Sequence, residues 1–376
     1  IGDARDWLVT QQEEDGGFEL ADFPGFETPD ALLALATAAQ TTGTWSTTEA
    51  RAAVEAVAHG TSSRTALTWA DDFVDGELDL DGQPGGDVPS AGLEAKVALL
   101  VALPLGIDPT DFDPDGDSAG PVDLTDRLRT IPPDLFNTFL IARSVEAALG
   151  RNVHQDDLQL VCEAQHNDGG WSFDRVVDGD NFDDADTTGV AVMALRDAGV
   201  APTDPVVTGA ADFFEATQQV SGAWRQAAGP FTANPADDPN STTLAVLGYT
   251  AAGEDPGARA VDPEAFLVAQ QVTAPGTAFG RIASPNDGFG VYTFATRQAI
   301  QGLALLDGRA TWLPGAGGTG RICLPPHGYS DVPSTACNDD ALRWLAFFAV
   351  ARGYTGGVFR PGNVFNRAQA SMWFDA

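Results

Sequence analysis

Apolar residues along this chain gather into short helix-length segments that are separated by polar turns. The clearest segment runs from Asp186 to Leu195, with Asp184 and Asp186 at its polar start. Five further segments rich in Ala and Leu begin near residues 29, 90, 135, 240 and 292. Helices that are apolar on nearly all sides are buried, whereas the amphipathic segment 47–57 is typical of an outer helix. A repeat of about fifty residues indicates an array of helix pairs, and six such inner helices can close a ring.

A second recurring pattern, which we call a knuckle, joins the helices. It consists of a helix end with glutamine, a glycine turn and an aromatic residue, and it occurs at residues 7–18, 160–171, 213–224 and 266–279. Glycine supplies the positive φ at the helix end, and the glutamine amide binds freed backbone groups. The aromatic residues, which are expected to pack the turn onto the next helix, are Phe18, Trp171, Trp224 and Phe279.

The charge of the chain narrows the classes of partner. Acidic residues number 54 against 20 basic ones, which gives a formal net charge of −34. Nucleic acid is excluded as a partner, because phosphate binding needs a basic surface. We interpret most carboxylates as solvated surface groups, which is typical of salt-adapted or surface-exposed proteins. No apolar run reaches the roughly 18 residues that a transmembrane helix needs.

The chain has three cysteines, Cys162, Cys323 and Cys337, whose pairing would indicate an oxidising compartment. Cys323 and Cys337 flank a short Pro-containing segment and are predicted to form a disulfide in an oxidising compartment. Cys162 is then left as a buried thiol. The spacing of the cysteines and histidines matches no zinc site.

The knuckles and capped Ala/Leu helices together resemble the repeats of the α/α-toroid superfamily, over about residues 1–312. That superfamily includes class II terpenoid cyclases, protein prenyltransferase β-subunits and cobalamin carriers. The resemblance implies an all-α fold in which residues 1–312 form an α6/α6 toroid of inner and outer helices.

Each activity in this superfamily can be compared with the residues. Class II cyclases protonate an alkene with the middle Asp of an Asp-x-Asp-Asp motif, and this implies a catalytic role for Asp186, assisted by Asp184. Thr187 replaces the final Asp, however, and both acids are also suited to capping a helix. Prenyltransferases hold zinc with Asp, Cys and His in a characteristic segment that is not found around Cys162.

The similarity to cobalamin carriers points instead to binding without catalysis. Residues 292–308 resemble a conserved-looking stretch of those carriers, although its proline is missing. Polar helix starts at the toroid mouth could then hold a small molecule, with a corrinoid as one candidate and no cofactor required. The predicted ligand-binding residues are Asp186, Asn240, Thr242, Tyr292 and Gln298.

An acidic loop between two repeats has the first half of a calcium-loop pattern. Its oxygen-bearing residues alternate, and Gly116 stands at the bend; the predicted calcium ligands are Asp111, Asp113, Asp115 and Asp117. The bidentate Glu expected about 12 positions from the start is missing. A solvated acidic loop is the alternative.

The composition changes after the repeats. Residues 313–328 are rich in Gly and Pro, as in a linker. Residues 329–376 resemble an S-layer homology domain in the order of five short motifs, with Tyr329 and Asn366 in place of the usual Phe and Thr. That resemblance implies contact between Arg367 and an anionic cell-wall polysaccharide. Such domains usually occur in groups of three, and this chain holds one.

These observations predict an exported, extracellular protein of the cell surface that binds a small molecule or takes part in surface assembly. Cell-wall polysaccharide is the expected partner of its tail. Two alternatives stay open: a cyclase-like enzyme that uses Asp186 as a general acid, and a structural subunit that self-assembles into a surface array or filament.

Overall fold

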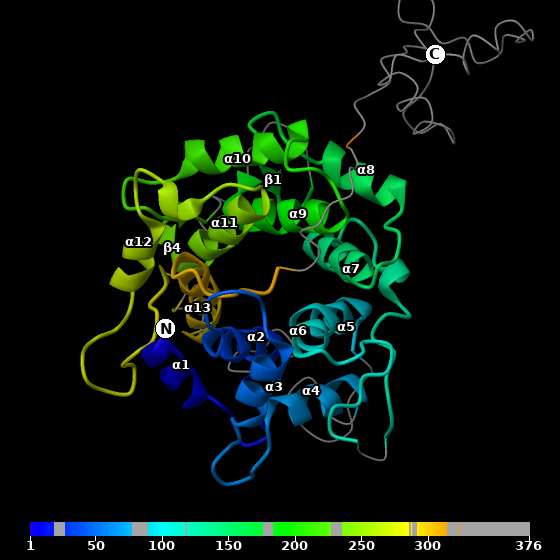
Figure 1. Ribbon diagram of the computed structural model, residues 1–376, viewed down its shortest axis with the longest axis vertical. Helices are drawn as coiled ribbons and strands as arrows, with labels where there is room; N and C mark the ends of the chain where they lie inside the picture. The colour runs from blue at the N-terminus through cyan, green and yellow to red at the C-terminus, as the bar shows by residue number, and fades with distance from the viewer. Residues whose placement is uncertain are drawn as a thin grey trace, which may run out of the picture.

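The computed structural model describes residues 1–18, 27–76, 89–116, 119–175, 183–226, 235–285, 287, 292–313 and 323. Six inner helices form a closed ring in which each packs against the next and the last packs against the first (Figure 1). They are α2 (Thr28–Ala38), the continuous helix made of α5 (Ala91–Val97), η1 (Ala98–Ala102) and α6 (Leu103–Leu105), α7 (Phe136–Ala148), α9 (Ala185–Asp197), α11 (Pro239–Ala251) and α13 (Tyr292–Leu306). These are the six apolar segments of the sequence, so the all-α toroid is confirmed.

The outer layer is less regular than six repeats would make it. Its helices in the described ranges are α1 (Gly2–Val9), α3 (Thr47–Glu55), α4 (Ala66–Val74), α8 (Gln155–Glu163), α10 (Pro205–Thr217) and α12 (Pro263–Ala269). Both α3 and α4 follow α2, whereas the connection from α6 to α7 contains only the short 3₁₀ turn η2 (Leu128–Thr130). That connection is rich in Asp and Pro, which disfavour a helix. A second short 3₁₀ turn, η3 (Pro256–Ala258), precedes α12.

Hydrogen bonds of the glutamine side chains build the knuckles as predicted. Gln165 Nε2 donates to the carbonyl oxygens of Gly169, at 2.9 Å, and Val206, at 2.7 Å. Gln218, rather than its neighbour Gln219, makes the equivalent pair of bonds in the next repeat. Each amide thus joins its own turn to the chain at the start of the next outer helix.

A threonine of the inner helix completes each knuckle. Trp171 N donates to Thr188 Oγ1, and Trp224 N donates to Thr242 Oγ1, both at 3.0 Å. Two-residue antiparallel ladders pair β1 (Trp171–Ser172) with β2 (Asp183–Asp184) and β3 (Trp224–Arg225) with β4 (Asp237–Asp238). The hydroxyl groups of these threonines therefore serve the fold.

The fourth knuckle differs from its prediction. Phe279 does not fold back, since its side chain is 43% exposed. Fully buried Ile282 takes the inner position, and its N–H donates to Thr296 Oγ1 at 3.0 Å. Because the turn in this repeat, 271–282, is longer, the residue that contacts inner helix α13 lies three positions after Phe279.

Glycine in the left-handed region allows each turn to contact the next outer helix. Gly169 has a φ of +95°, and a Cβ there would lie 2.0 Å from the carbonyl oxygen of Gly209 on α10. An equivalent contact joins the two ends of the ring. A Cβ at Gly280 would lie 2.1 Å from the carbonyl oxygen of Asp3 on α1. Only glycine fits these positions without displacing backbone.

The disulfide prediction was wrong. Cys323 is bonded to Cys162 on α8 and is therefore not free to pair with Cys337, which lies outside the described residues. The backbone N–H of Cys323 also donates to Asp204 Oδ2 at 3.2 Å. The chain beyond α13 thus returns to the outer layer of the toroid. A search of the described helices finds none that could cross a lipid bilayer.

Candidate functional site

A cavity of about 290 Å³ lies on the axis of the toroid and takes part of its wall from every inner helix. Its wall combines an apolar belt with a smaller set of polar side chains. The apolar belt consists of Leu33, Leu99, Leu100, Ile141, Val190, Met193, Leu244, Leu247 and Phe294. The polar lining includes Asp30, Lys96, Asn137, Ser144, Asp186, Asp197, Gln298 and Gln301.

One part of the belt is a π-helix. The π-helical segment η1 contributes Leu99 and Leu100, and it stands just before Pro104, which has no backbone N–H to donate. Local π-helical turns widen a helix and change which side chains face inward. Leu99 and Leu100 stand three and four positions after Lys96, so the three residues lie on one face of the continuous helix and line the cavity together.

Two buried ion pairs join inner helices beside the cavity. Glu27, at the start of α2, accepts hydrogen bonds from Arg297 Nη2 at 3.0 Å and from Thr293 Oγ1 at 2.7 Å, both on α13. Glu27 and Arg297 are fully buried. On the other side of α2, Lys96 Nζ lies 2.6 Å from Asp30 Oδ2. These pairs fix the first inner helix against both of its neighbours.

Asp184 and Asp186 have different tasks. Asp184 caps α9: its Oδ1 accepts from Thr187 N at 2.5 Å and its Oδ2 accepts from Thr187 Oγ1 at 3.0 Å. Asp186 lines the cavity, and its buried Oδ1 has no hydrogen-bond partner among the described residues. Burial, followed by the charges of Asp184 and Asp238, raises the pKa of Asp186 well above its usual value. Burial at the cavity therefore favours the neutral form of this carboxyl group.

A second carboxyl group of the same kind, Asp197, was missed from the sequence. It stands in the last turn of α9, lines the cavity and has a buried Oδ2 without a partner in the described chain. Burial raises its pKa well above the usual value, while hydrogen bonding to Ser144 opposes the shift. Asp186, Val190, Met193 and Asp197 follow the 4-3-4 spacing of one helix face, and this signal could have revealed Asp197.

The chain after α13 covers one end of the cavity. Trp312 is part of the cavity wall, and its ring centroid lies 5.8 Å from that of Trp45. Ala310 N donates to Thr41 O at 2.9 Å and holds this segment against the loop after α2. A neighbouring hollow of about 270 Å³ is lined by Leu313 and shares Met193 and Asp197 with the central cavity. Residues 312–313 thus lie where the two spaces meet.

The structure brings only some of the predicted ligand-binding residues to this cavity. Asp186 and Gln298 line it. Asn240 is buried and donates to Gln298 Oε1 at 3.0 Å, which makes it a support for that side chain. Thr242 is fully buried in its knuckle and does not line the cavity. Tyr292 begins α13, but its side chain lies outside the described part of the chain, as does Arg367.

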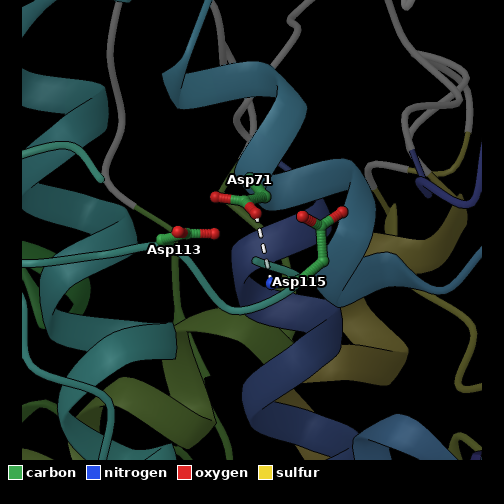
Figure 2. Close-up of side chains that lie close together, drawn as sticks. All are labelled: Asp71, Asp113 and Asp115. Carbon is green, nitrogen blue, oxygen red and sulfur yellow. Dashed lines mark hydrogen bonds between the residues drawn. The ribbon is translucent and has the colours of Figure 1, made fainter. Parts of the chain in front are cut away.

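The acidic loop forms a separate cluster with a residue that the sequence did not suggest. Figure 2 shows Asp113 and Asp115 of the loop beside Asp71 of α4. One carboxylate oxygen from each residue lies within 4.8 Å of the other two. Asp111 is exposed and is not part of this group, and Asp117 falls outside the described residues.

Comparisons with known proteins identify the tail. Residues 328–371 match the S-layer homology domain. The tail contains an S-layer homology domain. This confirms the resemblance of residues 329–376 and places Arg367 inside the matched segment. No curated protein matches the chain.

Two solved structures are similar to the toroid at low identity. One is described as a protein from Actinoplanes, with a TM-score of 0.47 and 18% identity over 80% of this chain and 97% of that chain. The other is a variant of the type II terpene cyclase MstE from Scytonema in complex with its product, merosterolic acid A. Its TM-score is 0.46 and its identity 17%, over 81% of this chain and 95% of that chain.

Proposed function

We propose that this protein is a cell-surface binding protein whose toroid holds a small, uncharged and largely apolar molecule in its central cavity. The observation that carries this proposal is the arrangement along α9, where an apolar face lies between the carboxyl groups of Asp186 and Asp197, whose pKa values are raised by burial. The two groups are 11 residues apart on one helix, a separation of roughly 16 Å along its axis.

The chemistry of the walls defines the ligand class. A protonated carboxyl group can donate a hydrogen bond to a carbonyl, ether or hydroxyl oxygen, and the apolar belt favours the hydrocarbon body between them. A charged ligand would lose its hydration on entering this apolar space, at a cost of several kcal/mol or more. The ligand is therefore expected to be neutral, with oxygen atoms near its ends.

The size of the cavity sets a further limit. Its volume of about 290 Å³ lies at the lower end of the usual range for drug-sized ligands, roughly 300–1,000 Å³. This volume favours a molecule smaller than a corrinoid. A corrinoid ligand therefore rests on the superfamily resemblance alone and stays a prediction.

The first test is native mass spectrometry of protein purified from its own organism, in which a co-purifying small molecule is expected.

Binding to the cavity is then measured with Nile red, a neutral apolar dye. Val190→Trp fills the cavity wall and should weaken dye binding at least about tenfold. Val220→Trp is the matched control, since Val220 is 98% exposed. Equal dye binding by the two variants would contradict a ligand site at the axis.

An acid-catalysed cyclisation is the second candidate function, because Oδ1 of Asp186 has no partner among the described residues and burial beside an apolar chamber raises the pKa of this carboxyl group. In that case Asp186 would protonate an alkene of a linear isoprenoid, and Phe294 would offer an aromatic face to the cation. Wild-type protein should then convert such a substrate and Asp186→Asn should not. If the wild type gives no product from linear isoprenoids, this candidate fails and the binding proposal is unaffected.

The tail completes the proposal, since its S-layer homology domain supports attachment to the cell surface. By resemblance, Arg367 contacts an anionic cell-wall polysaccharide. Sedimentation of the chain with purified cell walls is expected to be reduced by Arg367→Ala and unaffected by Val190→Trp. Self-assembly into an array stays a prediction.

A further inference from the structure

The cluster of Asp71, Asp113 and Asp115 joins the outer helix α4 to the loop that follows α6. None of the three side chains lines the central cavity, so the cluster is independent of the proposed binding site. Phe112 anchors the loop: it is fully buried and exchanges two backbone hydrogen bonds with Val122, each 3.0 Å long. This fixes the two loop aspartates opposite the helix.

Asp71 contributes a buried oxygen that has no partner among the described residues. Its side chain is 1% exposed. Its Oδ2 accepts a hydrogen bond from Asp115 N at 3.3 Å, whereas its Oδ1 is buried and has no hydrogen-bond partner in the described part of the chain. In Figure 2 this second oxygen faces the side on which Asp113 lies. An unpaired buried carboxylate oxygen is costly unless a cation or a proton satisfies it.

The three carboxylates gather at one place. One oxygen of each residue lies within 4.8 Å of an oxygen of the other two, and Asp71 is the buried member of the group. Negative charges this close repel one another, and a cation among them would remove that repulsion. Asp113 lies two positions before Asp115 in the loop, and its Oδ1 also accepts a hydrogen bond from Gly116 N at 2.7 Å.

We propose that Asp71, Asp113 and Asp115 bind one calcium ion, with water completing its coordination. Calcium binds six to eight oxygens at about 2.3–2.6 Å, so that opposed ligands lie roughly 5 Å apart. The carboxylate oxygens, all within 4.8 Å of one another, fit around one such ion. The exposed position of Asp115 leaves room for water on the outer side. Three carboxylates in an open site resemble the weaker extracellular calcium sites, with a Kd of about 10⁻⁴–10⁻³ M.

The experiment is a calorimetric titration of calcium chloride into the full chain after treatment with a chelator, at near-neutral pH and physiological salt. The wild type should show saturable binding at one site. Asp71→Asn and Asp115→Asn should each weaken it at least about tenfold, the size of loss seen when a metal site is disturbed. Asp111→Asn is the matched control, because it removes the same charge from an exposed residue of the same loop outside the cluster.

Three results would overturn the proposal. The first is the absence of saturable binding by the wild type, which would leave a shared proton as the explanation of the cluster. The second is equal weakening by Asp111→Asn, which would mean diffuse attraction by the chain's charge of −34. The third is equal affinity for magnesium, which would exclude a calcium site. Circular dichroism of each variant confirms folding, and should Asp71→Asn unfold, Asp115→Asn alone decides the outcome because its side chain is exposed.

Discussion

Replacing Arg297 by methionine should destabilise the toroid more than any surface change, because it leaves a buried charge without its partner. Arg297 and Glu27 are both fully buried, and their contact joins the last inner helix to the first. Removing one member of a buried ion pair costs about 3–5 kcal/mol of unfolding free energy. With a shift of about 2–4 °C per kcal/mol for a domain of a few hundred residues, the Tm should fall by about 6–20 °C.

A double-mutant cycle separates this effect from simple loss of packing. Glu27→Gln combined with Arg297→Met removes both charges and should recover most of the lost stability, since neutral groups of similar size replace a buried pair at little cost. The control is the exposed pair of Arg51 and Glu55 on α3, where Arg51→Met should cost less than about 1 kcal/mol. Urea unfolding followed by circular dichroism gives the four free energies. A loss below about 1 kcal/mol for Arg297→Met would refute the argument.

Three further predictions concern the turns, the disulfide and pH. Gly169→Ala should cost at least about 2 kcal/mol in urea unfolding, through its positive φ and a backbone clash, and more than Gly43→Ala, where φ is also positive but no atom lies within 4 Å. Breaking the Cys162–Cys323 disulfide with a reductant should destabilise the toroid by about 2–5 kcal/mol, and a Cys162→Ser variant that melts like the wild type would contradict this. Burial raises the pKa of Asp183 to about 7, above its usual value of 3.8, so the folded chain keeps a proton that the unfolded chain loses. Stability should therefore fall as the pH rises from about 4 to about 7, and Asp183→Asn should flatten that slope in thermal melts.

The sequence predicted the elements whose causes are local. Helix starts and knuckles depend on caps, glycine turns and apolar runs that lie within a few residues of each other, and the structure has all six inner helices where these signals stand. The capping role of Asp184 was one of two alternatives, and its hydrogen bonds to Thr187 decide between them. The role of Thr242 could also have been found, because Thr188 and Thr296 occupy the same place in the neighbouring repeats.

Two of the features that were missed depend on contacts between distant segments. Cys162 and Cys323 are separated by 161 positions, and nothing near either residue indicates that the chain returns from α13 to α8. Asp71 lies on a helix about 40 positions before the acidic loop, so the loop pattern alone could not suggest it as a neighbour of Asp113 and Asp115. Local patterns carry no information on which helix faces a given loop.

The disulfide between α8 and the chain beyond α13 also determines how the protein would respond to a mechanical load. If the tail is held by a surface, tension applied beyond Cys323 passes through the covalent bond to Cys162. The chain between the two cysteines carries none of that tension along its backbone. This shielded loop contains α9, α11, α13 and Trp312, which make up much of the cavity wall. A toroid tethered in this way can be pulled by its anchor while these three inner helices stay out of the path of the load.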